Sequence, residues 1–155
     1  VRPQISCELY PYFTRRKPRG EDTIVIETRE PDASTDALAH AVIGAALEVH
    51  RHLGPGFLEE VYEEALCLEL RLRQIPFERQ KLVRIDYKGD YVGEGRLDLL
   101  VADRLVVELE AVKAFAPIDK AKLISYLKAS GRHLALLINF HVPLLRDGIQ
   151  RVVRS

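Results

Sequence analysis

The sequence predicts an α/β fold in which helices pack on a short mixed β-sheet. Apolar residues recur at helical spacing in two segments between residues 34 and 73. Three strand patterns joined by turn signals follow, which is typical of an antiparallel meander. A further helix pattern then leads into the apolar run HLALLINF, which indicates a crossover helix followed by a buried parallel strand.

The first helix is expected to begin near Ser34-Thr35-Asp36, any of which can cap it, and to end at Gly54-Pro55-Gly56. Glycine can take the left-handed terminal conformation there, and proline cannot continue the helix.

The second helix is expected over residues 58–73. Its apolar arc on a helical wheel also contains Glu59 and Glu69, whereas Glu63 falls on the polar side. Because isolated carboxylates are rarely buried without a partner, Glu59 is expected to face a cation, a positive side chain or a cleft. The wheel does not choose between Glu59 and Glu69, and a glutamate at the edge of the helix is the alternative.

The three strands of the meander are expected over residues 81–87, 91–101 and 105–109, with Lys88-Gly89-Asp90 as the first turn. If residues 102–104 form a three-residue loop, Asp98 lies opposite Glu108 and Arg96 lies opposite Glu110. Alternation along the strands then places all four on one face. A two-residue turn would shift the register by one and separate the two acids.

Asp98 and Glu108 are therefore expected to lie about 5 Å apart, where like charges repel. A hard divalent cation is the economical way to neutralise them, since Mg²⁺ typically takes one or two protein carboxylates. In the alternative, Asp98 pairs with an arginine and Glu108 titrates or points to solvent.

The remaining segments complete the domain. A helix is expected over residues 117–130, closed by Gly131, and a strand over residues 133–140. A short basic helix is the expectation for residues 144–153. Residues 1–33, with four prolines and the basic cluster Arg15-Arg16-Lys17, are interpreted as an N-terminal arm with one strand at residues 23–28, and residues 34–155 as the domain.

Composition excludes several classes. The 23 basic residues balance the 23 acidic ones, so bulk charge gives no argument for nucleic acid or membrane. Cys7 and Cys67 have no metal-ligand spacing, and free thiols in a cytoplasmic protein are expected. No apolar run approaches the length of a membrane span.

Five sequence blocks together carry a family pattern. Gly56-x-x-Glu59-x-x-Tyr62 stands in GPGFLEEVYEEAL, and GRLDLLV, VELEAV, YLKASG and LLINF follow in order. Over about residues 38–153 the chain resembles the GxxExxY protein family, a branch of the PD-(D/E)xK nuclease-like superfamily. The resemblance implies a restriction-endonuclease-like core: helices, three-stranded antiparallel meander, crossover helix and parallel strand.

The resemblance also implies that Asp98 and Glu108 are ligands of Mg²⁺ or Mn²⁺, with Glu59 as an additional acidic ligand. Glu110 stands where the motif has its lysine, and Lys122 where the next helix usually has glutamine. We expect Lys122 to act as a displaced lysine. Two alternatives remain: Lys113 is a second candidate for that role, or Glu110 pairs with Arg96 in an inactive centre.

The function predicted in this way is a metal-dependent nuclease that hydrolyses nucleic acid phosphodiesters, with DNA favoured over RNA. The competing hypothesis is a catalytically inactive module of the same fold that binds nucleic acid or a protein partner. Glycoside hydrolysis by paired acids is disfavoured by their closeness. An exposed strand edge leaves a homodimer open.

Overall fold

The computed structural model describes residues 30–155, and the expected strand at residues 23–28 and the basic cluster at residues 15–17 lie outside this range. The elements in chain order are α1 (Ala33–Leu53), α2 (Glu59–Leu72), β1 (Phe77–Tyr87), β2 (Asp90–Val101), β3 (Leu105–Glu110), α3 (Pro117–Ser130), β4 (Leu134–Asn139), the 3₁₀ helix η2 (Leu145–Gly148) and β5 (Ile149–Val153).

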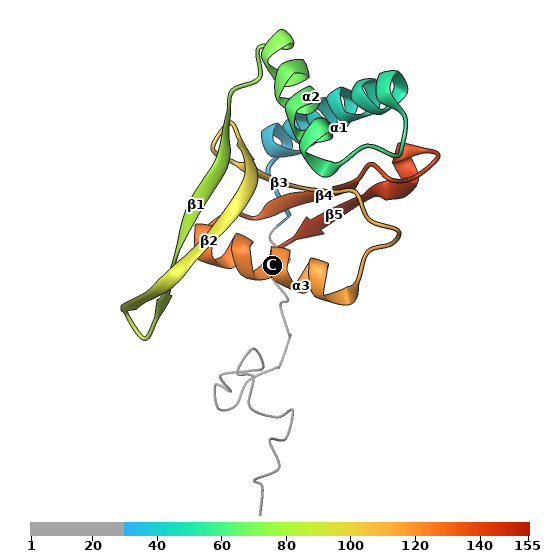
Figure 1. The fold of residues 1–155 in the computed structure, drawn as a ribbon. Coiled ribbons are helices and arrows are strands. Elements are labelled where there is room, and N and C mark those ends of the chain that lie inside the picture. The colour runs from blue at the N-terminus through green and yellow to red at the C-terminus, as the bar shows by residue number, and fades with distance from the viewer. Residues whose placement is uncertain (1–29) are drawn as a thin grey trace, which may run out of the picture.

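The strands of residues 30–155 form a five-stranded mixed sheet in the order β1-β2-β3-β4-β5. Strands β1, β2 and β3 are an antiparallel meander, β4 is parallel to β3, and β5 is antiparallel to β4. Figure 1 shows α1 and α2 on one face of the sheet and α3 on the other. The predicted fold class is confirmed, including the crossover through α3.

The sheet separates two buried clusters within the described residues. On one side Leu99, Leu105 and Leu109 pack with residues of α1 and α2. On the other side Leu97 and Val106 pack with residues of α3. Both faces of β3 and β4 are therefore apolar, as expected for strands at the centre of a three-layer fold.

The ends of the helices differ from the prediction at one point. The N-cap of α1 is Asp32, whose Oδ1 accepts a hydrogen bond of 2.8 Å from Thr35 N, and not one of residues 34–36. Asp32 has the extended backbone that lets its carboxylate reach the first turn. Gly54 ends α1 and Gly131, in the left-handed conformation, ends α3, as predicted.

The C-terminal segment does not form the expected basic helix. It forms the short helix η2 and then β5, which pairs with β4 and buries Val152. Gly148 allows this path, because a Cβ there would lie 2.2 Å from the carbonyl oxygen of Asn139. Pairing along β4 therefore decides the structure of this segment.

The buried face of α2 is rotated from the predicted apolar arc. Glu63, expected on the polar side, is only 6% exposed and shares the buried face with Tyr62 and Leu66. Leu68 and Leu72, expected to be buried, are 55% and 70% exposed. The rotation turns acidic side chains of α2 toward the sheet.

None of the helices within residues 30–155 has the length and apolar character that a membrane span requires.

Candidate active site

Strands β2 and β3 pair closely near their turn and separate beyond it. The pairs are Val101 with Leu105, Leu100 with Val106 and Leu99 with Val107, which is the register predicted from a three-residue loop. Beyond these three pairs, two acidic side chains bridge the strands: Asp98 N donates to Glu108 Oε1 at 3.1 Å, and Leu109 N donates to Asp98 Oδ2 at 2.9 Å.

At the point of separation each carboxylate thus takes the place of a backbone carbonyl of its own strand, because it accepts from a backbone N–H of the neighbouring strand. This exchange brings Asp98 and Glu108 together, as the sequence predicts, and it fixes the orientation of both side chains.

A local irregularity in β1 and β2 explains why the acids point into this gap. Gln80 has a φ of 53° and faces Asp98 between the pairs Arg79–Leu99 and Lys81–Leu97. Leu97 packs on the α3 side and Leu99 on the α1 and α2 side, so the alternation of faces slips at Asp98.

Arg96 does not face Glu110, contrary to the expectation of one continuous face. The Cα partner of Arg96 is Leu82 in β1, because the pairing of β2 with β3 covers only residues 99–101 and 105–107. No ion pair joins Arg96 to Glu110 within the described residues. That alternative explanation for Glu110 is therefore wrong.

The paired acids are poorly solvated. Burial, together with the charge of Asp98, raises the pKa of Glu108 to about 7, although Lys122 opposes the shift. Burial also raises the pKa of Asp98 above its ordinary value, and the backbone N–H of Leu109 opposes this. Within residues 30–155 the side-chain partner of Asp98 is the amide of Gln80, not an arginine.

Lys122 approaches the pair from α3. Its Nζ lies 3.5 Å from Glu108 Oε2, and its side chain is 47% exposed. Burial alone would lower the pKa of Lys122, but Glu108, Tyr126 and Glu110 raise it above its ordinary value. Its ammonium is therefore charged beside the acids. Lys113, the second candidate, is exposed in the segment between β3 and α3.

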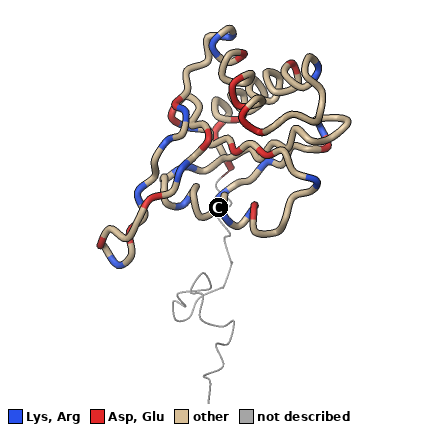
Figure 2. The backbone as a smooth tube through the Cα atoms, in the orientation of Figure 1, with Lys and Arg blue, Asp and Glu red and all other residues tan. Residues whose placement is uncertain are grey.

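Glu59 and Glu110 complete the set of predicted acids. Burial and the charges of Asp98 and Glu110 raise the pKa of Glu59 to about 7. Burial raises the pKa of Glu110, which lines a recess with Glu108, Asp119 and Lys122. In Figure 2 the acidic positions at the start of α2 lie above those of β2 and β3, so the fold gathers the predicted residues from both helix layers.

Sequence reasoning missed a supporting network behind Asp98. Glu63 Oε1 accepts hydrogen bonds from Arg79 Nε at 2.5 Å and from Gln80 Nε2 at 3.0 Å, and Gln80 Nε2 also lies 3.4 Å from Asp98 Oδ1. Glu63 therefore positions Gln80 against Asp98. A signal was present, because Glu63 is four residues after Glu59 and therefore neighbours it on the helix surface, although the helical wheel assigned it to the polar side.

The start of α2 is held by Tyr62. Its hydroxyl donates to Gly54 O at 2.6 Å and accepts from Phe57 N at 3.1 Å, and its ring stacks on Phe140. Gly56 has a φ of 112°, which favours glycine. The Gly56-x-x-Glu59-x-x-Tyr62 spacing thus places Glu59 at the first turn of the helix, pointed toward the acids.

The donor set fits a hard divalent cation. Asp98 and Glu108 provide oxygen ligands in the number that Mg²⁺ usually takes from a protein, and their raised pKa values show that Lys122 only partly offsets the cost of burying them, so a cation is favoured there. Within residues 30–155 no group of three or more acidic, histidine or cysteine side chains is close enough to form a preformed metal cluster. Glu59 therefore does not form a preformed three-ligand site with Asp98 and Glu108.

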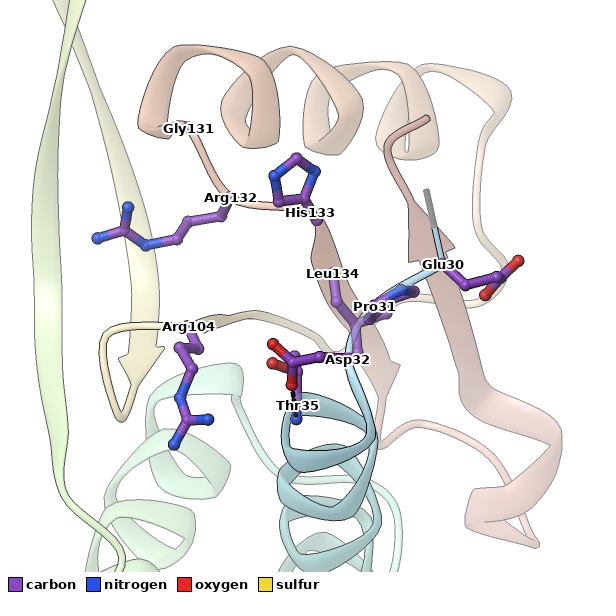
Figure 3. Close-up of a pocket in the computed structure, with 9 residues that line it drawn as sticks. All are labelled: Glu30, Pro31, Asp32, Thr35, Arg104, Gly131, Arg132, His133 and Leu134. Carbon is purple, nitrogen blue, oxygen red and sulfur yellow. Dashed lines mark hydrogen bonds between the residues drawn. The ribbon is translucent and has the colours of Figure 1, made fainter. Parts of the chain in front are cut away.

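A cavity of about 410 Å³ lies at the opposite end of the sheet, near the starts of β3 and β4 (Figure 3). Its charged side chains already have partners: Asp32 caps α1, Arg132 pairs with Asp103, and Arg104 bonds to Ser34. None of the predicted site residues lines this cavity.

Comparison with known proteins places the site in a family context. No curated protein matches the chain. Two solved structures are similar to it over 81% of this chain and 72% of theirs: LHK-Exo in complex with dAMP (13% identity, TM-score 0.45) and the alkaline exonuclease LHK-Exo from Laribacter hongkongensis (15%, 0.40). The family model of the PD-(D/E)XK nuclease superfamily matches residues 36–152. Because this match covers most of the sequence, the chain belongs to the PD-(D/E)XK nuclease superfamily.

Proposed function

We propose that this protein is a metal-dependent nuclease of the GxxExxY branch that hydrolyses nucleic acid phosphodiesters, with DNA preferred over RNA. The observation that carries the proposal is the pair of a half-buried Asp98 and a buried Glu108 between separating strands, with the ammonium of Lys122 beside it. Membership of the nuclease superfamily supports the same reaction class.

In this proposal Asp98 and Glu108 hold Mg²⁺ or Mn²⁺ through carboxylate oxygens. The bound cation supplies Lewis-acid activation of water and offsets charge that develops on phosphate oxygens. Glu59 contributes a third acidic group on the α2 side. Because its pKa is raised to about 7, the Glu59 carboxyl can accept or release a proton near neutral pH.

Lys122 would perform the role of the motif lysine, whose position is occupied by Glu110. Its Nζ lies beside Glu108 Oε2, and half of its side chain is open to solvent, from which a phosphate can approach. A positive point charge there can orient water or offset phosphate charge without depending on the backbone position of the motif lysine. Glu110 occupies that motif position and lines the same recess, where its charge supports that of Lys122.

A second candidate function is binding without catalysis. It is favoured by one observation: the motif lysine is replaced by Glu110, and the ammonium nearest the acids comes from a half-exposed side chain on another element. A protein of this kind would keep the cation site and the fold but would hold nucleic acid or a protein partner without cleaving it.

Thermal unfolding with and without Mn²⁺ tests the cation site. At about ten times its Kd, Mn²⁺ is expected to raise the Tm by roughly 4 °C, since such binding adds about 1.4 kcal/mol. The Asp98→Ala variant should lose this rise, and Asp86→Ala, at an exposed acid in β1, should keep it. A Tm that does not respond to Mn²⁺ or Mg²⁺ would contradict the assignment of the ligands.

Cleavage assays separate the two functions. With Mn²⁺ the nuclease is expected to cut linear, supercoiled or single-stranded DNA, and both Asp98→Ala and Lys122→Gln should abolish or greatly reduce cutting. If the metal raises the Tm but neither DNA nor RNA is cut, the binding module is the better description.

A further inference from the structure

Helix α2 and its N-cap residue Leu58 carry a second apolar face, most of which lies outside the core of the domain. Its members are spaced alternately by three and four residues, which is the heptad spacing of helices that pair side by side. They are Leu58 (72% exposed), Val61 (39%), the partly buried Ala65, Leu68 (55%) and Leu72 (70%).

This stripe points away from the domain. The buried residues Tyr62, Leu66 and Leu70 lie about 120° from the centre of the stripe around the helix axis. Figure 1 places α2 on the outside of the molecule, above the sheet. Within residues 30–155, Leu58, Leu68 and Leu72 belong to neither buried cluster, whereas Ala65, at the centre of the stripe, also packs against the cluster beneath α1 and α2. A continuous exposed apolar face of this kind marks an interaction surface.

The charged residues beside the stripe indicate that a second copy of this chain can bind it in an antiparallel orientation. Glu64 and Arg71 follow one edge of it, both exposed, and Glu69 lies on the other edge. In an antiparallel pair of α2 helices, Glu64 meets Arg71 of the partner subunit, and two-fold symmetry forms this contact twice. In a parallel pair Glu64 would instead meet Glu69 of the partner subunit, and like charges repel.

We propose that α2 is the interface of a homodimer, in which the stripe packs antiparallel against the same stripe of a second copy. When the helices are aligned so that Glu64 meets Arg71 of the partner subunit, Ala65 faces Leu68 of the partner subunit. Val61 then faces Leu72 of the partner subunit. A small residue then stands opposite a large one at the centre, which allows close approach of the helices. The proposal does not depend on catalysis.

The affinity of such an interface is modest. The helix is 14 residues long, so the seam is shorter than a standard protein interface. We expect a Kd on the order of micromolar, because the apolar contact must offset the loss of translational and rotational freedom. The equilibrium is therefore measurable by sedimentation velocity between micromolar and near-millimolar concentrations.

The first test removes the apolar contact. In the Leu68→Glu variant the dimer should weaken by tenfold or more, since a charge is placed at the centre of the seam. Leu82→Glu is the matched control, because Leu82 is 57% exposed on β1, away from α2. A wild-type chain that stays monomeric, a dimer that survives Leu68→Glu, or one lost equally in Leu82→Glu would each overturn the proposal.

The second test addresses the antiparallel geometry. Glu64→Arg and Arg71→Glu should each weaken self-association, whereas an equimolar mixture of the two variants should form a heterodimer with both charge pairs restored. The double variant should also dimerise with itself. Circular dichroism checks that each variant is folded, which is needed because Glu64 also pairs with Arg79. Failure of the mixture to associate would overturn the proposed pairing.

Discussion

The two halves of the β2–β3 pair have opposite physical character. Near the turn, Leu99 and Val107 pair through the backbone and are fully buried in apolar surroundings. One residue further along, Asp98 and Glu108 exchange side-chain hydrogen bonds with the opposite strand, and burial raises the pKa of both. We call the paired residues 99–101 and 105–107 the closed half, and Asp98 and Glu108 the split half. The closed half stabilises the fold, and this stability allows the split half to hold two unfavourable charges close together.

The strongest way to break this comparison is to weaken the closed half. Leu99→Ala is expected to lower the free energy of unfolding by about 3–4 kcal/mol, because a fully buried leucine is replaced by a cavity. Urea denaturation measures the change. Leu82→Ala, at an exposed leucine of β1, should cost less than about 0.5 kcal/mol. Equal losses at the two positions would contradict the assignment of stability to the closed half.

The closed half was predictable from the sequence. Polar residues 102–104 interrupt two apolar runs, and a three-residue loop fixes the register that joins Leu99 to Val107. The same register predicts that Asp98 lies opposite Glu108, although the two strands separate at this point. Gly131 and Pro117 likewise delimit α3, because their backbone preferences are local properties of the residue.

The rest of the site depends on contacts that local patterns do not contain. Glu63 is buried because Arg79 and Gln80, which come from β1, hold its carboxylate. The positive φ of Gln80 has no signal in its residue type, since such a backbone usually favours glycine or asparagine. The apolar arc of α2 is also wider than the core requires, so the helical wheel could not give the rotation that turns Glu59 inward and Leu68 outward.

A second prediction sharpens the comparison by removing one charge from the split half. Glu108→Gln keeps an oxygen that can accept from Asp98 N but removes the buried charge. In metal-free protein at pH 8, the variant is expected to be more stable than the wild type by about 2 kcal/mol, since the folded protein disfavours a carboxylate whose pKa burial has raised to about 7. Urea denaturation in the presence of a chelator measures the difference.

The pH dependence of this gain has a definite sign. The pKa of Glu108 is raised from its ordinary 4.5 to about 7 in the folded state, so folding favours its protonated form. Its contribution to stability is full below pH 4.5 and is lost as the pH rises through about 7. The advantage of Glu108→Gln should therefore grow across this window. Glu78→Gln, at an exposed acid, should show no such trend, and a flat difference for Glu108→Gln would contradict the burial of a charged Glu108.

The smallest effect is expected where the split half meets α3. Lys122→Gln should change the free energy of unfolding by less than about 1 kcal/mol, because the lysine is half exposed and its Nζ is 3.5 Å from Glu108 Oε2. The pKa of Glu108 should nevertheless rise further, since Lys122 now holds it down. Carboxyl-carbon NMR titration measures this pKa. Lys120→Gln, at an exposed lysine of the same helix, should leave it unchanged. If the pKa of Glu108 is the same in both variants as in the wild type, the ammonium of Lys122 does not interact with the acids. The closed half and the split half would then differ only in how their buried groups are solvated.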